Sequence, residues 1–329
     1  MPRLVVTPGE PAGVGPDLLL EVATKDWPFE IVAVADSNML AERAHLLGLS
    51  ISMEPANYAT APSPHRAGLL PVDHVTCMYS VVAGKLTSGN AAYVLTTLDR
   101  AIDHCLIGRA NALVTGPIHK ATITQSGEPF DGHTNYLATR CQAPPPIMLL
   151  TTADQSFRVA LATMHLPLVD VPTALSVEGL QHVFRTTADG LQRDFGLLSP
   201  RLLVTGLNPH AGEDGTLGTE ETHVIKPAIL AARNHGIHIE GPFSADTVFV
   251  DDLRTRGDVV IAMYHDQGLP AIKYAGFGRV INVTLGLPIV RTSVDHGTAA
   301  DLAGTGRAQA KSLRAAVETA ADIVRSRGT

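Results

Sequence analysis

Short runs of apolar, mostly β-branched residues alternate along the chain with longer segments in which apolar residues recur every three to four positions. The short runs are typical of buried strands, and the longer segments are typical of amphipathic helices. Helical patterns begin at Pro16 and at Ser37, each after such a run. The alternation predicts an α/β protein with buried, largely parallel strands. The clearest strand-like runs are Leu4–Val6, Ile31–Val34, Ala112–Val114 and Leu202–Val204.

Two segments carry the helical pattern most clearly. Between Ser88 and Leu106 the apolar positions return with helical spacing, and Ser88 or Asn90 is a candidate N-cap. The stretch 313–324 repeats the pattern, and we expect this helix to pack on the first domain. Between the two helices, the run Pro144–Pro146 is the best candidate for a linker or domain edge.

Length and composition narrow the picture. The chain has 329 residues, 45% of them hydrophobic, which is enough for a large core in one elaborated domain or two domains. Its 25 basic and 32 acidic residues give a net charge of −7, which disfavours nucleic acid and anionic membranes as partners. Any anionic ligand therefore requires a local cluster of basic groups.

The cysteines and the hydropathy pattern indicate the class of protein. Cys77, Cys105 and Cys141 are far apart and form no Cys-x-x-Cys pair, so neither a disulfide framework nor a thiolate zinc site is predicted. No run of 18 apolar residues predicts a membrane-spanning helix. We therefore expect a cytoplasmic globular protein.

Two glycine-containing segments follow predicted strands. Thr7–Pro16 opens a helix and is either a ligand-facing loop or an ordinary turn, but it matches neither the P-loop nor the G-x-G-x-x-G dinucleotide pattern. Gly116–Lys120 and Phe130–Thr134 follow a later strand, where ligands of open α/β sheets gather. His133 and Thr134 are candidate phosphate donors there, and Thr134 is equally a candidate helix cap.

Three histidines, His165, His210 and His265, each lie near the end of an apolar strand-like run. If these runs are neighbours in a parallel sheet, their ends converge at one edge. Three neutral imidazoles with an open fourth position form a catalytic site for zinc or a similar divalent ion. The alternative for each is a surface or core histidine. Asp246 and Asp266 are candidates to orient the imidazoles, or else ordinary turn residues.

The last part of the chain carries separated polar groups and a loop of small residues. Lys273, Asn282 and Arg291 are spaced nine residues apart, and with His133 and Thr134 they would form a cationic cluster for a phosphorylated anion. Individually, each is more often a surface side chain. The loop Asp295–Gly304 offers backbone amides and close approach to a flat ligand.

These residues fall in eight ordered blocks that resemble the 4-hydroxythreonine-4-phosphate dehydrogenase family of vitamin B6 biosynthesis over essentially the full chain. The Asp295–Gly304 loop also resembles a segment of isopropylmalate and isocitrate dehydrogenases. The matching blocks are Gly9–Gly13, Gly116–Pro117 with His119–Lys120, Gly132–Thr134, His165–Leu168, Asn208–Glu213, Ala245–Thr247, Tyr264–Gly268 and Arg291–Ala299.

The resemblance implies a two-domain isocitrate/isopropylmalate-dehydrogenase-like α/β fold with the active site in the interdomain cleft. The first domain, on the cofactor side, would comprise residues 1–125 and 290–329. The second, carrying metal and substrate residues, would comprise residues 126–289. The resemblance further implies a homodimer whose active site is shared between the subunits.

The implied reaction is the oxidation of 4-phosphooxy-L-threonine to 2-amino-3-oxo-4-phosphooxybutanoate, which loses carbon dioxide to give 3-amino-2-oxopropyl phosphate. It requires NAD or NADP and one divalent metal, zinc being expected before cobalt or magnesium. The implied roles are as follows: metal ligands His165, His210 and His265; substrate contacts His133, Thr134, Lys273, Asn282 and Arg291; and cofactor contacts Gly297, Thr298, Ala299 and Asp301. The candidates for the general base are Asp246, Asp266 or a water held by one of them.

One residue departs from the family pattern. Asn135 follows the His-Thr pair where the family is expected to have glutamate. This difference leaves open a paralogous dehydrogenase that acts on a 4-phosphorylated threonate or erythronate. A zinc-dependent hydrolase is the alternative from another class, since three histidines and an open position also suit hydrolysis. The cofactor-like loop Asp295–Gly304 argues against the hydrolase.

Overall fold

The computed structural model describes residues 1–128, 130, 132–276 and 278–328. The chain divides into unit 1, Met1–Pro144 with Leu287–Gly328, and unit 2, Pro145–Gly286. The division falls inside the proline run, as the sequence predicts. The expected boundary near residue 126 was wrong, because residues 126–144 belong to unit 1.

The reason for this shift is the packing of helix α5 (His133–Arg140) on helix α3 (Ala91–Leu106). The Tyr136 hydroxyl donates a 2.7 Å hydrogen bond to Asp99 of α3. Arg140 forms ion pairs of 2.7 Å with Asp99 and 3.0 Å with Asp103. These contacts hold α5 in unit 1, although its sequence carries no signal of which unit it joins.

The sheet of unit 1 is entirely parallel, in the order β3-β4-β2-β1-β5-β12. Val5 of the central strand pairs with Val32 on one side and Leu113 on the other, and all three are buried. This confirms the expected buried parallel strands. The strand bounds are β1 Arg3–Thr7, β2 Glu30–Ala35, β3 Ser52–Pro55, β4 Leu69–His74, β5 Ala112–Thr115 and β12 Val290–Val294.

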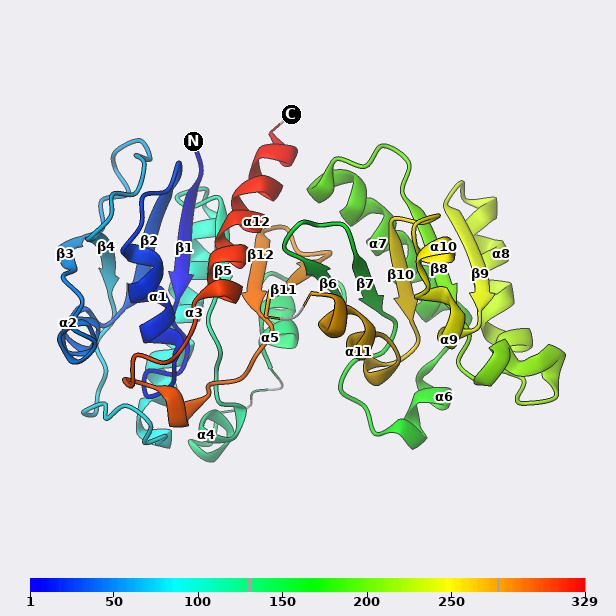
Figure 1. Ribbon diagram of the computed structural model, residues 1–329, viewed down its shortest axis with the longest axis horizontal. Coiled ribbons are helices and arrows are strands. Elements are labelled where there is room, and N and C mark those ends of the chain that lie inside the picture. Colours follow the sequence, from blue (N-terminus) through cyan, green and yellow to red (C-terminus); the bar gives the residue numbers. More distant parts are fainter. Residues whose placement is uncertain (129, 131, 277, 329) are drawn as a thin grey trace. The chain divides into compact units, whose positions relative to one another are not determined.

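Helices cover both faces of this sheet. Helix α12 crosses β5 and β12 on one face, and α3 packs on β1, β2 and β5 from the other (Figure 1). Thr292 of β12 donates a 2.8 Å hydrogen bond to the Ala316 carbonyl of α12, so the C-terminal helix packs on unit 1 as expected. The remaining bounds are α1 Gly15–Ala23, α2 Ser37–Leu46, α4 Lys120–Gln125 and α12 Lys311–Arg327.

Two expected helix caps differ in the structure. Asn90 is the N-cap position of α3, but its side chain makes no capping bond and instead contacts the Tyr79 backbone through bonds of 3.1 Å each way. The N-cap of α5 is Gly132, so Thr134 lies inside the first turn and is not the cap.

The sheet of unit 2 has the order β11-β6-β7-β10-β8-β9. Strands β7, β10, β8 and β9 are parallel, whereas β6 runs antiparallel to β7 and β11. Helix α7 packs on one face, and α11 covers β7 and β10 on the other (Figure 1). The bounds of the strands are β6 Ile147–Thr152, β7 Arg158–Leu161, β8 Arg201–Thr205, β9 His238–Phe243, β10 Val259–Ala262 and β11 Val280–Leu285. Those of the helices are α6 Val171–Ala174, α7 Val177–Phe195, α8 Lys226–Asn234, α9 Ala245–Val248, α10 Asp251–Arg254 and α11 His265–Ala275.

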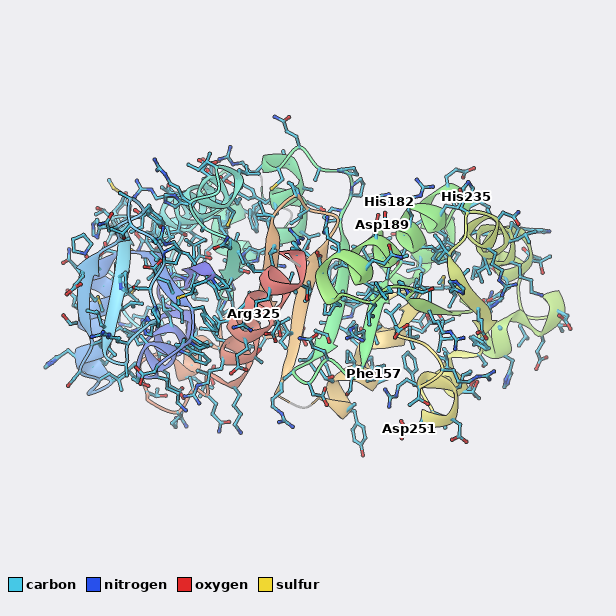
Figure 2. The ribbon with its side chains drawn as sticks, turned by 90° about the horizontal axis from the view of Figure 1, so that it is seen from above. Phe157, His182, Asp189, His235, Asp251 and Arg325 are labelled. Carbon is cyan, nitrogen blue, oxygen red and sulfur yellow. The ribbon has the colours of Figure 1, made fainter. Side chains whose placement is uncertain are left out.

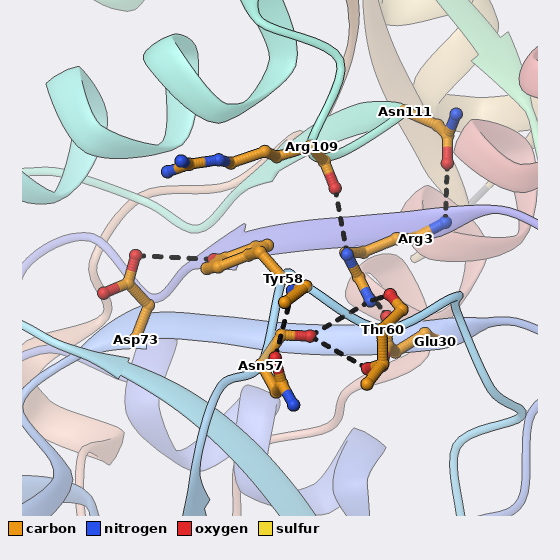
Figure 3. A network of polar contacts seen from close by, with 9 residues as sticks. Arg3, Glu30, Asn57, Tyr58, Thr60, Asp73, Arg109 and Asn111 are labelled. Atoms are coloured by element: carbon orange, nitrogen blue, oxygen red, sulfur yellow. Dashed lines mark hydrogen bonds and ion pairs between the residues drawn. The ribbon is translucent and has the colours of Figure 1, made fainter.

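The amino end of the unit 1 sheet is closed by a buried arginine (Figure 3). The Arg3 guanidinium pairs with Glu30 and donates to the carbonyls of Thr60 (2.9 Å) and Arg109 (3.3 Å). Its backbone amide donates to Asn111 Oδ1 at 2.8 Å. This network therefore stabilises the edge at which β1 begins, opposite to the carboxyl ends where ligands of parallel sheets bind.

The structure can be compared with the predictions about disulfides and membrane-spanning helices. Cys77, Cys105 and Cys141 are all free and partly buried, so they form no disulfide with one another. Within the described residues, none of the helices combines the length and the apolar character needed to cross a bilayer.

Candidate functional site

The three predicted metal ligands follow three adjacent parallel strands of unit 2. His165 comes after β7, His265 after β10 and His210 after β8, and β10 lies between the other two strands. The expectation that the histidine-bearing runs are side by side is therefore confirmed. Because the strands are parallel, all three histidines follow the carboxyl edge of the sheet.

His165 and His265 lie beside one another, with their ring centroids 5.6 Å apart. Nδ1 of His265, the first residue of α11, donates a 2.6 Å hydrogen bond to the Asp266 carboxylate. An ionised carboxylate accepts only, so it fixes the proton on Nδ1 and leaves the lone pair on Nε2, as at many metal-binding histidines. This pair therefore fits a divalent ion by its donor chemistry.

His210 lies in an unusual turn. It and the next four residues adopt left-handed backbone conformations, with φ of 53°, 52°, 81°, 41° and 53°, and only one of the five is glycine. A left-handed helical conformation costs roughly 1–2 kcal/mol for each L-residue with a side chain. Such a turn requires specific contacts that hold it in place, and its presence could not be read from the sequence.

The buried carboxylate of Glu221 provides such contacts. Its Oε1 accepts hydrogen bonds from the backbone amides of Leu207 (2.8 Å) and Asn208 (2.7 Å), and its Oε2 accepts from the Asn208 side chain at 3.0 Å. Glu221 is 2% exposed and begins a π-helical turn, Glu221–Ile225, before α8.

Gln267 connects the ends of β8 and β10. Its side-chain oxygen accepts from Thr205 Oγ1 (2.7 Å) and from the Met263 amide (2.6 Å), and its amide donates to the Gly206 carbonyl at 2.7 Å. The segment before His210 is thereby tied to the helix that begins at His265. Sequence reasoning missed both Gln267 and Glu221, although Gln267 lies inside one of the recognised blocks.

Asp246 lies close enough to His210 to interact with it electrostatically. A hydrogen bond from the Ser244 hydroxyl lowers the pKa of Asp246, and the proximity of His210 lowers it further. Asp246 is therefore a carboxylate at neutral pH. Among the described residues, however, no three His, Cys, Asp or Glu side chains are grouped as ligands of one metal ion. The structure thus brings two of the three histidines together and leaves the third, with its carboxylate, on a neighbouring strand end.

In unit 1 the two glycine-rich segments meet at the ends of β1 and β5. The Glu10 amide donates to the Pro117 carbonyl at 2.9 Å, and the Gly116 amide donates to the Thr7 carbonyl at 2.7 Å. A Cβ on Gly15 would lie 1.7 Å from the Pro8 carbonyl oxygen, and one on Gly116 would lie 2.4 Å from it. Gly116 is needed because the backbones of the two loops touch, and Gly15 is needed because the first loop folds back on itself at Pro8.

Glu10 is a buried carboxylate in this cluster that sequence reasoning did not single out. It accepts hydrogen bonds from the Ala12 amide (3.2 Å) and the Thr122 hydroxyl (3.4 Å). Burial raises its pKa. A buried acidic residue in a turn matches no local sequence pattern, so only the packing of the loops identifies it.

The predicted cofactor residues Gly297, Thr298, Ala299 and Asp301 lie in the loop after β12, against the first glycine-rich loop. The Val14 amide donates to the Thr298 carbonyl at 2.9 Å. Ala299 has a left-handed backbone with φ of 38°. Gly297 has open space around it, since a Cβ there would meet no atom within 4 Å. The loop thus leaves room at the position where a ligand would approach the backbone.

His133 and Arg291 are two of the predicted substrate residues in unit 1. Arg291 is 2% exposed and donates a 2.8 Å hydrogen bond to the Thr115 hydroxyl, and burial lowers its pKa to about 9. Burial and the nearby Arg291 cation lower the pKa of His133 well below its usual value. His133 Nε2 is buried and has no hydrogen-bond partner among the described residues. A neutral imidazole beside a buried cation is suited to an anionic ligand.

The other predicted substrate residues are in different settings. Thr134 and Asn135 lie in the first turn of α5, where Asn135 is exposed. Lys273 is exposed on α11, and Asn282 lies on β11 of unit 2. Asn282 Oδ1 is buried without a partner in the described part of the chain. His133 and Asn282 therefore each carry a buried polar atom that a bound ligand of matching hydrogen-bond character would satisfy.

A separate cavity of about 480 Å³ lies at the other edge of the unit 2 sheet. It is lined by residues that precede β7 and β10, among them Phe157 and Asp251, so it is at the amino ends of these strands. Figure 2 shows both residues on the side away from His182 and Asp189 of α7. The cavity contains none of the predicted site residues.

Comparisons with known proteins agree with one another. The family model described as "Pyridoxal phosphate biosynthetic protein PdxA" matches residues 28–320. The chain is 50% identical to the 4-hydroxythreonine-4-phosphate dehydrogenase of Thioalkalivibrio sulfidiphilus (99% of this chain, 98% of the relative). It is 49% identical to that of Serratia proteamaculans (98% and 97%). A crystal structure of 4-hydroxythreonine-4-phosphate dehydrogenase from Klebsiella pneumoniae matches with a TM-score of 0.88 at 31% identity, covering 98% of this chain and all of that one.

Proposed function

This chain belongs to the PdxA family of pyridoxal phosphate biosynthetic proteins, and from that membership we propose that it oxidises 4-phosphooxy-L-threonine at C3 with NAD or NADP. The product, 2-amino-3-oxo-4-phosphooxybutanoate, is a β-keto acid that loses carbon dioxide to give 3-amino-2-oxopropyl phosphate. The observation that carries the proposal is the set of three histidines at the carboxyl ends of the adjacent parallel strands β7, β10 and β8.

His165, His210 and His265 are the proposed ligands of one divalent ion. The adjacent rings of His165 and His265 and the Asp266 contact to Nδ1 support this assignment. When bound, a divalent ion would supply Lewis acidity toward the substrate hydroxyl, and a nicotinamide would supply the hydride acceptor. Zinc is the expected ion, with cobalt and magnesium as alternatives.

The phosphate is proposed to bind His133, Thr134, Lys273, Asn282 and Arg291. The Arg291 guanidinium supplies positive charge, while His133, which stays neutral, donates a hydrogen bond without adding a second buried cation. The buried, unpartnered Nε2 of His133 supports its role, because buried polar atoms normally have partners. The buried Oδ1 of Asn282 only accepts hydrogen bonds, so it suits a donor group of the substrate, and the Asn282 amide nitrogen is the atom that would donate to phosphate. Fixing the phosphate orients the C3 hydroxyl at a distance from the anchoring groups.

The general base is proposed to be Asp246 or Asp266. Asp266 already accepts a hydrogen bond from His265, a contact that orients the imidazole. Asp246 is exposed and lies near His210, and its lowered pKa keeps it ionised, so it is the better placed of the two to take a proton directly or through a water. The nicotinamide cofactor is proposed to bind the loop that holds Gly297, Thr298, Ala299 and Asp301, and the subunits are proposed to form a homodimer with shared active sites.

The experiment follows reduced nicotinamide by absorbance, with purified protein, a divalent metal and the phosphorylated amino acid. We expect reduction of NAD or NADP only when metal and substrate are both present. No reduction of either nucleotide would overturn the proposal. Release of inorganic phosphate without nicotinamide would instead support the hydrolase alternative.

One observation keeps a second substrate in the test. Asn135 follows the proposed phosphate residues and is uncharged, where a glutamate was expected. The test compares turnover of the amino acid with turnover of 4-phosphorylated threonate and erythronate. The result shows whether the enzyme prefers a substrate with an amino group or with a hydroxyl group at C2. Faster turnover of a hydroxy acid would assign the chain to sugar-acid oxidation, and faster turnover of the amino acid would assign it to pyridoxal phosphate biosynthesis.

A further inference from the structure

We propose that Glu221 is a positioning residue, whose buried carboxylate holds the left-handed turn that carries His210. The inference rests on the proposed function only in taking His210 to be a metal ligand. The hydrogen bonds, the strained turn and the close packing at two glycines support it independently of any bound group.

The Glu221 carboxylate contacts the chain just before the left-handed turn. Leu207 and Asn208 lie before the turn, separated from it only by Pro209, and their consecutive amides both donate to Oε1 of Glu221, at 2.8 and 2.7 Å. The Asn208 side chain donates to Oε2 at 3.0 Å and also to Glu220 at 2.8 Å. Three donors thus fix the direction in which the chain enters the left-handed segment at His210.

Two glycines allow this close approach. A Cβ on Gly212 would lie 2.6 Å from Oε2 of Glu221. A Cβ on Gly206 would lie 2.7 Å from Cα of Ala211 and 3.0 Å from Oε1 of Glu221. Gly212 of the turn therefore packs directly on the carboxylate, Gly206 before the turn packs on Ala211 and the carboxylate, and neither position tolerates a side chain without movement of the turn.

Other roles for Glu221 fit less well. Its side chain is buried, and both of its oxygens already accept hydrogen bonds, so it is not available as a proton acceptor for substrate. In the described residues it belongs to no group of three metal-binding side chains. None of the ion pairs found in the described residues involves its carboxylate, and its charge is compensated by N–H donors that precede the turn. What the carboxylate contacts is the backbone that presents His210.

The test compares Glu221→Ala and Glu221→Gln with the control Glu220→Gln. Glu220 is the adjacent carboxylate and contacts the same Asn208 side chain, but it accepts no bond from the Leu207 or Asn208 amide. Three quantities are measured for each: amide hydrogen exchange across residues 206–218 in metal-free protein, zinc affinity by calorimetry with zinc alone, and the unfolding midpoint.

For Glu221→Ala we expect faster exchange at Leu207 and Asn208, and zinc binding weakened about 10- to 100-fold, the range found when a partner of a ligand is removed. Glu221→Gln keeps one oxygen for the two backbone amides but places a donor opposite Asn208 Nδ2. We therefore expect near-normal exchange at these amides and a loss of zinc affinity of roughly 3- to 10-fold, below that range. Glu220→Gln should bind zinc within about twofold of the unaltered protein, since the backbone contacts stay intact.

A folded Glu221→Ala protein with unchanged zinc affinity and unchanged exchange would overturn the proposal. A lower unfolding midpoint with unchanged zinc affinity would also overturn it, because that is the result of a purely structural role. If Glu221→Ala does not fold, the zinc affinity and amide exchange of Glu221→Gln are compared with the values expected for it, and unchanged zinc affinity in that variant would overturn the proposal. If the unaltered protein binds no zinc, the proposed metal site fails, while hydrogen exchange at Leu207 and Asn208 still tests whether Glu221 holds the turn.

Discussion

The backbone amide of Gly304 donates a 2.6 Å hydrogen bond to Oδ2 of Asp17. The same carboxylate forms a buried ion pair with Arg43, whose guanidinium also donates to the carbonyls of Gly13 and Pro11 at 3.0 Å each. One buried pair therefore joins the end of the proposed cofactor loop to the first glycine-rich loop.

Breaking this pair from one side should destabilise unit 1. In Arg43→Met the Asp17 carboxylate stays buried without its cation, and we expect the free energy of unfolding to fall by about 3–5 kcal/mol. The double variant Arg43→Met with Asp17→Leu removes both charges and should recover part of the loss. Urea unfolding measures both. A loss below about 1 kcal/mol in the single variant would show that the pair contributes no more than an exposed one.

Asp266→Asn should weaken metal binding without changing the fold. The carboxylate of Asp266 is exposed, so its replacement costs little stability. An asparagine amide can present its NH₂ donor as well as its oxygen acceptor to His265 Nδ1, so the acceptor-only group that fixes the tautomer is lost. We expect zinc affinity to fall roughly 10- to 100-fold. Asp252→Asn, an exposed change in α10, is the matched control. Equal zinc affinity in the two variants would argue against the orienting role.

His210→Ala should abolish metal binding and leave the protein folded. His210 is exposed at a strand end and contributes little to the core, so its loss should change the unfolding midpoint only slightly. Zinc titration measures the loss of metal binding, and thermal unfolding measures whether the protein stays folded. Stoichiometric zinc binding with retained turnover would remove His210 from the proposed ligand set.

Arg291→Ala should raise the KM for the phosphorylated substrate far more than the KM for the nicotinamide. A charge-assisted contact to phosphate contributes roughly 1.5–3 kcal/mol, which corresponds to a rise of about 10- to 150-fold. Steady-state kinetics with each ligand varied in turn gives the two values. An equal rise in both would indicate misassignment or a structural defect, because Arg291 is buried in β12.

The pKa of His133 predicts a pH dependence of stability. Its folded-state pKa lies well below the unfolded value, so the unfolded chain binds more protons as the pH falls below that value. The buried His133 therefore does not change the free energy of unfolding above about pH 6.5. Below about pH 6.5 it lowers that free energy by up to about 1.4 kcal/mol for each pH unit. Urea unfolding at pH 7.5 and 5.5 should show a smaller loss in His133→Asn than in the unaltered protein. His65, whose burial also lowers its pKa, is the control: His65→Asn should reduce the loss independently. An unchanged pH dependence in His133→Asn would contradict the assignment.

Local patterns in the sequence identified much of the fold. Apolar runs located β1, β2, β5 and β8, because buried parallel strands must be apolar on both faces. Helical spacing located α3 and α12, and the proline run marked the division between the units. The ordered blocks identified the family, which the comparisons confirm.

The placement of α5 and of the three histidines depends on contacts between segments that are distant in sequence. Local sequence patterns did not predict these contacts. The assignment of α5 to unit 1 follows from the Tyr136 and Arg140 contacts with α3. The pairing of His165 with His265 and the separate placement of His210 follow from the order of strands in the sheet and from backbone geometry after β8.

The sequence by itself determined the α/β class, the main strands and helices, the family, and the residue types available for chemistry. Periodicity and short motifs are local properties, so they can be read along the chain. Only the tertiary structure decided which charges are buried together, as for Asp17 with Arg43, and which carboxylate holds a strained turn, as for Glu221. Burial and hydrogen-bond direction arise when segments far apart in sequence pack together, and local patterns along the sequence do not reveal them.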